Sequence, residues 1–257
     1  MKTTSVILTI YNKDFLIQRV AKSILENSSD QVKEIIVVFD GCEDLSETYT
    51  KEIFNSQNKL SVKYNYADNL FETKCNNIAL KQSSCDYSMI IQDDMIIQEK
   101  DFDKRMIKPF MFTDVLCVTS RMAHNDLILP NGAIAWTDKA GKDTFTRRDL
   151  FYIRDIANRG PLLVDNKKLQ TLNYLDEIYS PQNLDDHDLC FRAWKEHGWV
   201  AGSYWIEYES RYEWGGSRGK NAEWLEEKYR NNLQTLASRH ADYMEANMKH
   251  NQERLIL

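Results

Sequence analysis

The stretch Ile90-Ile-Gln-Asp-Asp-Met95 decides the fold, because it closes an apolar run that begins at Tyr87 and stops abruptly at two adjacent carboxylates. A run of this length, bounded by polar residues, predicts a buried strand rather than a helix. The end of such a strand carries Asp93 and Asp94 to the carboxyl edge of a sheet, where α/β proteins bind ligands. Paired carboxylates are hard oxygen ligands, suited to an Mg²⁺ or Mn²⁺ ion that carries a substrate phosphate. A solvated turn after a strand would give the same pattern, so only other motifs in the chain can distinguish a metal-binding pair from such a turn.

Strand-like and helical segments alternate through the first hundred residues. Apolar or alternating runs predict strands at 5–10, 34–39, 61–66 and 87–91. Helical spacing of apolar residues predicts helices between them, at 14–25, 44–54 and 71–82. This repetition with short polar joints predicts an α/β fold with a parallel sheet and right-handed crossovers. The ends of the first, second and fourth strands would then converge on one crevice.

Beyond residue 101 the pattern is looser. The expected elements are a helix and then short strands, at 102–112, 115–119 and within 127–136. The polar, charge-rich segment 138–159 is interpreted as loops that border a site. Residues 186–197 have the spacing of an amphipathic helix, and 221–250 that of a long terminal helix with one apolar stripe. The stripe predicts that this helix packs on the rest of the chain or, in a homo-oligomer, on a second copy.

The composition narrows the class of protein. The 257 residues are 42% hydrophobic and 28% charged, which is typical of a globular protein with a substantial core. A net charge of -6 argues against nucleic acid or an anionic membrane as the partner. Five cysteines, an odd number without metal-site spacing, predict reduced thiols and a cytoplasmic location. The sequence enters a strand almost at once, without a signal peptide, and we expect no transmembrane segment.

Four segments in order resemble the family 2 glycosyltransferases of the GT-A fold. They are Ser5-Val-Ile-Leu-Thr-Ile-Tyr-Asn12, Glu34-Ile-Ile-Val-Val-Phe-Asp-Gly41, the stretch from Asn77 to Asp94, and Leu184-Asp-Asp-His-Asp-Leu-Cys-Phe-Arg192. They are similar to the family's opening strand, its Asp-Asp-Gly strand, the helix and strand that lead to Asp-x-Asp, and its Glu-Asp-x-Asp-Leu-x-x-Arg block. The glycine-aromatic pair Gly198-Trp199 follows the last segment, and the resemblance extends over most of the chain.

The resemblance implies a Rossmann-like, mostly parallel sheet flanked by helices, with a C-terminal helical extension. It divides the chain into a nucleotide-sugar-binding half at 1–100, an acceptor-binding half of the same domain at 101–220, and a C-terminal helix at 221–257. The implied reaction moves a sugar, with inversion, from a nucleotide diphosphate donor to an acceptor hydroxyl on a glycan or other molecule. The expected donor is a UDP- or dTDP-sugar, and the expected cofactor is Mn²⁺ or Mg²⁺.

The resemblance also assigns site residues. Asp94 would bind the metal ion, Asp186 would be the general base, and Asp185 would support the acceptor. Asp40 would accept a hydrogen bond from the imide N–H of the base, which fits uracil or thymine better than adenine. Lys74 is either a phosphate ligand or a solvated helix charge. The residues assigned to the nucleotide and its phosphates are Thr9, Tyr11, Asn12, Asp40, Lys74, Asp93, Arg218 and Lys220.

The sequence departs from the family pattern at several positions, which leaves two other interpretations open. Phe39 and Gln92 replace aspartates, Asn76 replaces the usual arginine, and Tyr204 to Trp214 contains no histidine. A catalytically decayed sugar- or protein-binding module would show such changes, although Asp94 and Asp186 are both retained. A nucleotidyltransferase would share the α/β layout, but it would normally carry a glycine-rich loop after the first strand. The segment that follows Thr9 lacks those glycines.

Overall fold

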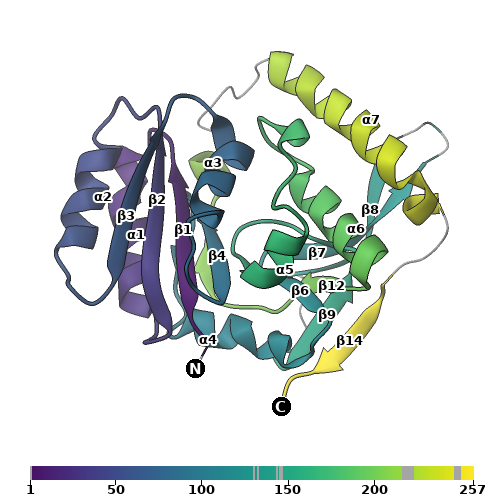
Figure 1. Ribbon diagram of the computed structural model, residues 1–257, viewed down its shortest axis with the longest axis horizontal. Helices are drawn as coiled ribbons and strands as arrows, with labels where there is room; N and C mark the ends of the chain where they lie inside the picture. The colour runs from purple at the N-terminus through teal and green to yellow at the C-terminus, as the bar shows by residue number, and fades with distance from the viewer. Residues whose placement is uncertain are drawn as a thin grey trace.

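The computed structural model describes residues 2–129, 131, 133–142, 144, 147–215, 223–245 and 250–257. In this part of the chain nine strands form one sheet, in the order β14-β9-β12-β6-β11-β4-β1-β2-β3 (Figure 1). The neighbours β4, β1, β2 and β3 run parallel, whereas β11, β9 and β14 join their neighbours antiparallel. The strands of this sheet are β1 Thr4–Ile10, β2 Val32–Asp40, β3 Ser61–Ala67, β4 Tyr87–Gln92, β6 Val115–Thr119, β9 Leu150–Arg154, β11 Leu162–Asp165, β12 Val200–Ser203 and β14 Gln252–Leu255.

Helices cover both faces of the sheet, which explains why its central strands are apolar on both sides. On β1, Val6 and Leu8 belong to a core shared with α1, α2 and α4, whereas Ile7 belongs to a second core shared with α3, α5, α6 and α7. The helices are α1 Asp14–Asn27, α2 Ser46–Asn55, α3 Phe71–Leu80, α4 Phe102–Ile107, α5 Asn166–Thr171, α6 Asp185–His197 and α7 Glu223–Glu245. The predicted α/β fold with a mostly parallel sheet is confirmed.

One prediction for the second half was wrong. The segment 138–159, interpreted as loops, contributes half of β8 and all of β9 and β10. Most of β8 is exposed or half-buried, whereas β9 and β10 are buried but short, so pairing with distant neighbours rather than a long apolar run holds these strands in place. A second small sheet has the order β10-β7-β8, and β5 pairs with β13. The remaining elements are β5 Ile96–Ile97, β7 Met122–Ile128, β8 Ile134–Gly141, β10 Ile156–Ala157, β13 Tyr208–Glu209 and the 3₁₀ turns Lys108–Met111, Glu177–Tyr179 and Tyr212–Trp214.

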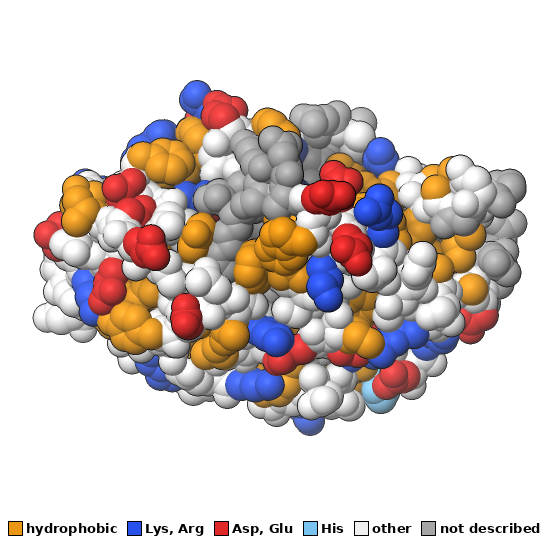
Figure 2. All heavy atoms as spheres, turned by 90° about the horizontal axis from the view of Figure 1, so that it is seen from above, with side chains coloured by type: hydrophobic (Ala, Val, Ile, Leu, Met, Phe, Trp, Pro, Cys, Tyr) orange, Lys and Arg blue, Asp and Glu red, His pale blue; other side chains and the backbone are white. Residues whose placement is uncertain are grey.

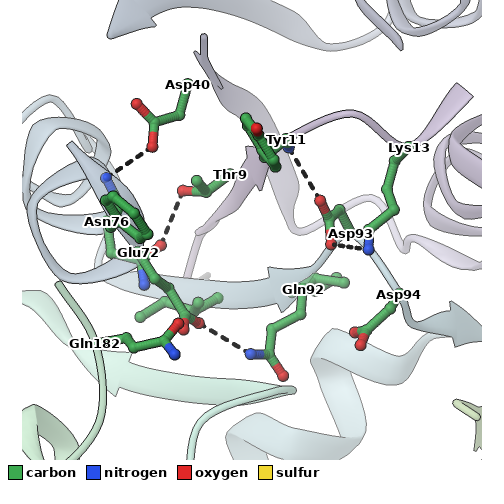
Figure 3. Close-up of a pocket in the computed structure, with 13 residues that line it drawn as sticks. Thr9, Tyr11, Lys13, Asp40, Glu72, Asn76, Gln92, Asp93, Asp94 and Gln182 are labelled. Atoms are coloured by element: carbon green, nitrogen blue, oxygen red, sulfur yellow. Dashed lines mark hydrogen bonds and ion pairs between the residues drawn. The ribbon is translucent and has the colours of Figure 1, made fainter. Parts of the chain in front are cut away.

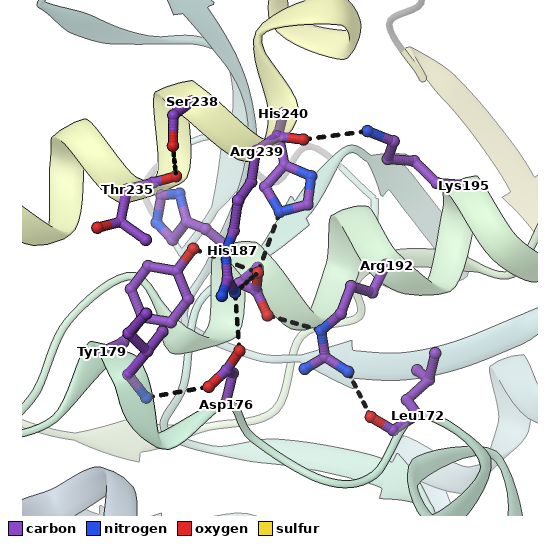
Figure 4. Close-up of polar contacts among 12 residues, drawn as sticks. Leu172, Asp176, Tyr179, His187, Arg192, Lys195, Thr235, Ser238, Arg239 and His240 are labelled. Atoms are coloured by element: carbon purple, nitrogen blue, oxygen red, sulfur yellow. Dashed lines mark hydrogen bonds and ion pairs between the residues drawn. The ribbon is translucent and has the colours of Figure 1, made fainter.

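The C-terminal part is more than a helix, because the chain ends in β14, which pairs with β9 at the edge of the sheet. As predicted, α7 packs on the rest of the chain: its Leu236 and Met244 are buried in the core that also contains α6. Figure 4 shows the polar part of this contact, with His240 of α7 and Arg192 of α6 labelled. Asp188 of α6 accepts hydrogen bonds from Arg192 Nε at 2.6 Å and His240 Nε2 at 3.0 Å. The part of the apolar stripe of α7 around Leu236 and Met244 is therefore buried within the chain, whereas Tyr229 is 39% exposed.

None of the helices in the described part of the chain combines the length and the apolarity that crossing a bilayer requires. Figure 2 shows the face on which the carboxyl ends of the parallel strands emerge, seen from above. Acidic, basic and hydrophobic side chains alternate over this face.

Candidate active site

The ends of β1, β2 and β4 and the start of α3 enclose a first cavity, as the sequence predicted. It is lined by Thr9, Tyr11, Lys13, Asp40, Phe71, Glu72, Asn76, Ile90, Ile91, Gln92, Asp93, Asp94 and Gln182 (Figure 3). The register of the sheet explains the convergence, since Thr9 pairs with Gln92 across β1 and β4. Five of the predicted nucleotide and metal residues therefore meet in this cavity: Thr9, Tyr11, Asp40, Asp93 and Asp94.

The inner part of this cavity offers an unused hydrogen-bond donor. Thr9 Oγ1 donates to Asn76 Oδ1 at 3.0 Å, which fixes the orientation of the amide. Asn76 is buried, and its Nδ2 has no hydrogen-bond partner. A buried N–H without a partner costs free energy, so this atom indicates a site for a ligand acceptor such as a carbonyl oxygen. The sequence analysis noted Asn76 only as a replacement for arginine.

Asp40 lines the same cavity but also shapes it. Its two carboxylate oxygens accept hydrogen bonds from the backbone N–H groups of Leu70, at 2.8 Å, and Phe71, at 2.7 Å. Phe71 has a φ of 64°, an unfavourable conformation for a bulky side chain, and the bonds to Asp40 hold the chain in it. Asp40 therefore positions the start of α3, in addition to the predicted contact with a base.

The adjacent carboxylates at the outer part of the cavity fit a divalent cation. Asp93 Oδ2 accepts a hydrogen bond from Tyr11 N at 3.1 Å, and its Oδ1 lies 3.7 Å from Lys13 Nζ. Burial raises the pKa of Asp93 to about 7 and also raises the pKa of Asp94. Asp94 Oδ1 is buried without a hydrogen-bond partner, which leaves a hard oxygen atom for Mn²⁺ or Mg²⁺. Gly215 lies against Asp94, because a Cβ on residue 215 would be 2.8 Å from Asp94 Oδ2.

Lys13 is a site residue that the sequence analysis missed. Its side chain is buried, lines the cavity and donates a hydrogen bond to the carbonyl oxygen of Trp214 at 2.5 Å. Figure 3 shows its ammonium group pointing toward Asp93. Lys13 thus joins the first strand to the segment that covers Asp94. Its position directly after Tyr11 and Asn12, at the end of an apolar strand, is the signal that could have identified it.

A second cavity adjoins the first, because Glu72 and Gln92 line both. Gln92 connects the two sides: its Nε2 donates to Glu72 Oε1 at 2.9 Å, and its Oε1 accepts from Arg121 Nη1 at 3.2 Å. The other residues that line the second cavity are Arg121, Trp136, Asn158, Arg159, Asn183, Leu184, Asp186, His187 and Tyr229.

Asp186 lines this second cavity and is held in its charged form. It lies in the first turn of α6, where the helix dipole favours a negative charge. Its Oδ2 accepts a hydrogen bond from Arg159 N, and its Oδ1 accepts one from His187 N, both at 3.0 Å. Burial would raise the pKa of Asp186, but the charges of His187 and Arg159 outweigh burial and lower it. An ionised carboxylate in a cavity is a suitable general base.

Asp185, the other predicted catalytic residue, has a different environment. It is fully buried, lines neither cavity and is paired with the guanidinium group of Arg159. Burial raises the pKa of Asp185 to about 7, although Arg159 opposes the shift. The pKa values of the neighbouring carboxylates Asp185 and Asp186 are thus shifted in opposite directions, as in enzymes that give adjacent acids different roles. Asp185 can act on the cavity only through Arg159.

The other predicted site residues are placed elsewhere. Lys74 lines neither cavity. Asn12 also lines neither, and its Oδ1 accepts a hydrogen bond from Glu43 N at 2.9 Å. Arg218 and Lys220 lie outside the described residues. Spacing in the sequence indicates which strand end a residue occupies, but it does not determine where its side chain points.

Beside the second cavity, His187 contacts Asp126 of β7, with His187 Nδ1 2.7 Å from Asp126 Oδ2. Burial would lower the pKa of His187, but the charge and hydrogen bond of Asp126 outweigh burial and raise it to about 9. In the same way His187 and His124 outweigh the burial of Asp126 and lower its pKa. No motif in the sequence identifies this cluster, because its members come from elements far apart in the chain.

The sequence of residues 5–159 matches the family described as Glycosyl transferase family 2. This match includes every lining residue of the first cavity except Gln182, and it ends before Asp186. No curated protein sequence matches the chain.

Solved structures of glycosyltransferases share the fold. They include the mannosyltransferase PcManGT from Pyrobaculum calidifontis in complex with GDP-Man and Mn²⁺, with a TM-score of 0.65 and 13% identity over 93% of this chain and 64% of that chain. TarS from S. aureus in complex with UDP has a TM-score of 0.59 and 14% identity over 95% and 73% of the two chains. Glucosyl-3-phosphoglycerate synthase from Mycobacterium tuberculosis, with Mn²⁺, UDP and phosphoglyceric acid, has a TM-score of 0.59 and 15% identity over 93% and 78%. The chain therefore spans less than two thirds of the mannosyltransferase.

Proposed function

Because the chain belongs to glycosyl transferase family 2 and is a glycosyltransferase, we propose that it transfers a sugar with inversion from a UDP- or dTDP-sugar to an acceptor hydroxyl. One observation carries this proposal: two adjoining cavities hold complementary chemistry, with Asp93 and Asp94 in the first and, in the second, Asp186, whose two carboxylate oxygens accept backbone hydrogen bonds. Inversion requires the acceptor to attack from the face opposite the departing diphosphate. A donor in the first cavity and an acceptor in the second would meet at Gln92 and Glu72, which line both.

The choice of base rests on two groups in the first cavity. Asn76 Nδ2 is a buried donor without a partner, and Asp40 is a carboxylate acceptor near it in the same cavity. Uracil and thymine present a carbonyl oxygen beside an imide N–H, so they match a donor and an acceptor together. Adenine presents an amino donor beside a ring acceptor, so a turned-over adenine would satisfy the same two groups, and only its larger purine ring distinguishes it from a pyrimidine. Guanine also carries a carbonyl beside an N–H, but it is larger than a pyrimidine. The size of the cavity therefore has to distinguish guanine from uracil and thymine.

The chemical roles follow from the positions of the side chains. Asp94, with Asp93 beside it, would hold Mn²⁺ or Mg²⁺, which when bound supplies positive charge that stabilises the departing diphosphate. Asp186 would take the proton from the acceptor hydroxyl as its oxygen attacks the anomeric carbon. Arg159 supports this base twice, because its backbone N–H binds Asp186 and its guanidinium group neutralises Asp185. Trp136 lines the acceptor cavity and offers an aromatic face to a sugar ring.

The two other interpretations of the sequence are less well supported. A nucleotidyltransferase does not agree with the family match or with the direct passage from β1 into Lys13 and α1. A catalytically decayed binding module would have no need to keep Asp94 Oδ1 buried without a partner and Asp186 ionised. We therefore favour an active enzyme.

We also propose a cytoplasmic location, which the cysteines support. All five are free thiols, and the Sγ atoms of Cys117 and Cys190 lie 4.0 Å apart without forming a disulfide. Such a pair persists in the reduced state in compartments where glutathione and thioredoxin keep thiols reduced.

A thermal-shift panel of UDP, dTDP, GDP and ADP, each with and without Mn²⁺, tests the donor site. A ligand that binds the folded state raises the melting temperature by mass action. We expect UDP or dTDP with Mn²⁺ to give the largest shift, and Asp94→Ala to abolish the Mn²⁺-dependent part. A larger shift with ADP, or equal shifts with and without Mn²⁺, would contradict the proposal.

A further inference from the structure

Three buried side chains from two elements form a cluster beside the second cavity. His124 and Asp126 lie on β7, and His187 lies on α6. One potential ligand atom from each residue can be chosen so that all three lie within 4.8 Å of one another. The exposed fractions of the three residues are 0%, 1% and 3%, so bulk water cannot solvate their polar atoms. Burial of two imidazoles and a carboxylate is costly unless their charges and lone pairs are balanced within the cluster.

Two atoms of the cluster face one another without a hydrogen bond. His124 Nδ1 and Asp126 Oδ1 are 3.2 Å apart, and both are buried without a hydrogen-bond partner. The other ring nitrogen, His124 Nε2, lies 2.8 Å from Asn158 Oδ1. If Nε2–H donates to this amide oxygen, then Nδ1 presents a bare lone pair to the carboxylate. A lone pair and a carboxylate oxygen repel one another unless a cation lies between them.

The distance between these atoms is the distance between two ligands of one metal ion. Ligands that are each about 2.0 Å from a tetrahedral zinc ion lie about 3.3 Å apart. A metal-bound histidine also generally gives its second N–H to a carbonyl or carboxylate oxygen, which fixes the ring. Asn158 Oδ1 provides that contact for His124. The ring of Trp136 stacks on His124 at a centroid distance of 4.3 Å and covers it.

His187 flanks Asp126 on the other side, where it forms a hydrogen bond with the second carboxylate oxygen. Its Nδ1 lies 2.7 Å from Asp126 Oδ2, and its Nε2 lies 4.0 Å from Asp186 Oδ1. One ring nitrogen therefore faces the cluster, and the other faces the proposed general base. Because His187 lines the second cavity, the cluster borders the proposed acceptor site.

We propose that His124, Asp126 and His187 bind one divalent transition-metal ion, zinc by preference, at a site separate from Asp94. Imidazole nitrogens favour zinc over Mn²⁺ and Mg²⁺, whereas the carboxylates of the donor cavity favour the harder ions. Three protein ligands leave a fourth position for water, as in zinc sites that are not purely structural. The metal ion replaces the proton between Asp126 and His187, so its binding releases a proton. Through His187 the site also restrains Asp186.

Bound metal can be measured without any sugar transfer, so this inference does not depend on the proposed reaction. The protein is treated with a chelator, dialysed, and then titrated with ZnCl₂ in the Asp94→Ala background, which disables the donor site. Calorimetry and elemental analysis after gel filtration give the stoichiometry, and Co²⁺ substitution reports the coordination through its visible absorption. His124→Ala is added to the same background, and His197→Ala, which removes a histidine outside the cluster, is the matched control.

We expect one tightly bound zinc per chain in the Asp94→Ala variant and in the His197→Ala control, and a loss of at least 100-fold in affinity with His124→Ala. We also expect a tetrahedral Co²⁺ spectrum that zinc abolishes. If His124→Ala does not fold, the Co²⁺ spectrum of the unaltered cluster still decides the matter. Absence of zinc after titration, without a Co²⁺ band, would overturn the proposal and leave a proton shared by Asp126 and His187. Retention of zinc by a folded His124→Ala variant would overturn it as well.

Discussion

Replacement of the proposed base, Asp186→Asn, separates catalysis from donor binding. Asparagine keeps the size of the side chain but cannot accept a proton at neutral pH, so we expect transfer to fall by roughly 10²- to 10⁴-fold. Donor affinity should change by less than about twofold, because Asp186 lines the second cavity and not the first.

The structure also sets the cost of this substitution in stability. Each carboxylate oxygen of Asp186 accepts one backbone hydrogen bond, from Arg159 N and from His187 N. An amide retains only one acceptor atom, so one buried N–H loses its partner, at a cost of about 1–3 kcal/mol in the free energy of unfolding. Assays must therefore be made well below the melting temperature of the variant. Asp165→Asn is a matched control, because Asp165 caps α5 by accepting from Lys168 N at 3.0 Å and lies outside both cavities.

The assay combines the initial rate of UDP release at saturating donor with the dissociation constant of UDP, for wild type and both variants. The expected result is a large loss of rate in Asp186→Asn alone, with all three proteins binding UDP equally. Transfer by a folded Asp186→Asn variant at within tenfold of the wild-type rate would refute the assignment of the base.

Three further predictions concern the donor cavity and the stability of the sheet. Asn76→Leu removes the unpartnered donor without changing the volume greatly, so UDP affinity measured by calorimetry should fall about 10- to 100-fold; unchanged affinity would exclude this atom from base recognition. Gly215→Ala places a Cβ 2.8 Å from Asp94 Oδ2, so Mn²⁺-dependent donor binding should weaken while the melting temperature changes little, and full Mn²⁺ dependence would contradict this placement. Hydrogen bonds from Lys63, Ser5 and Ser84 outweigh burial and lower the pKa of Glu34 to about 2, so its charged form stabilises the fold above pH 4.5, and that stability is lost as the pH falls toward 2. In urea unfolding, the free energy of unfolding of wild type should exceed that of Glu34→Gln by about 3 kcal/mol at pH 7 and by only about 1 kcal/mol at pH 3. A difference that does not depend on pH would refute the role of the Glu34 charge.

The sequence predicted the first half of the fold well because its strands are buried on both faces. The runs that became β1, β2 and β4 are almost continuously apolar, and α1 has a clear amphipathic pattern. By contrast, β8 and β14 consist mostly of exposed or half-buried residues. Their strand conformation comes from pairing with β7 and β9, which no local pattern records.

The candidate site divides in the same way. Residues directly at strand ends, such as Thr9 and Asp93, could be placed from the sequence because the sheet determines their location. Lys13 and Asn76 could not, since their roles depend on contacts with Trp214 and Thr9 that form only in the folded chain. The proximity of His124 to His187 depends on the packing of β7 against α6, so no sequence motif could predict it.

The most direct test of the proposed reaction is the anomeric configuration of its product. The enzyme is incubated with Mn²⁺ and a panel of UDP- and dTDP-sugars that are α-linked to the diphosphate, with water as the acceptor in the absence of another. Proton NMR spectra recorded before mutarotation show which anomer is released first. Inverting transfer predicts the β-anomer, formed only with the metal ion and not by Asp186→Asn. Initial release of the α-anomer, or the absence of metal-dependent release from every donor in the panel, would contradict it.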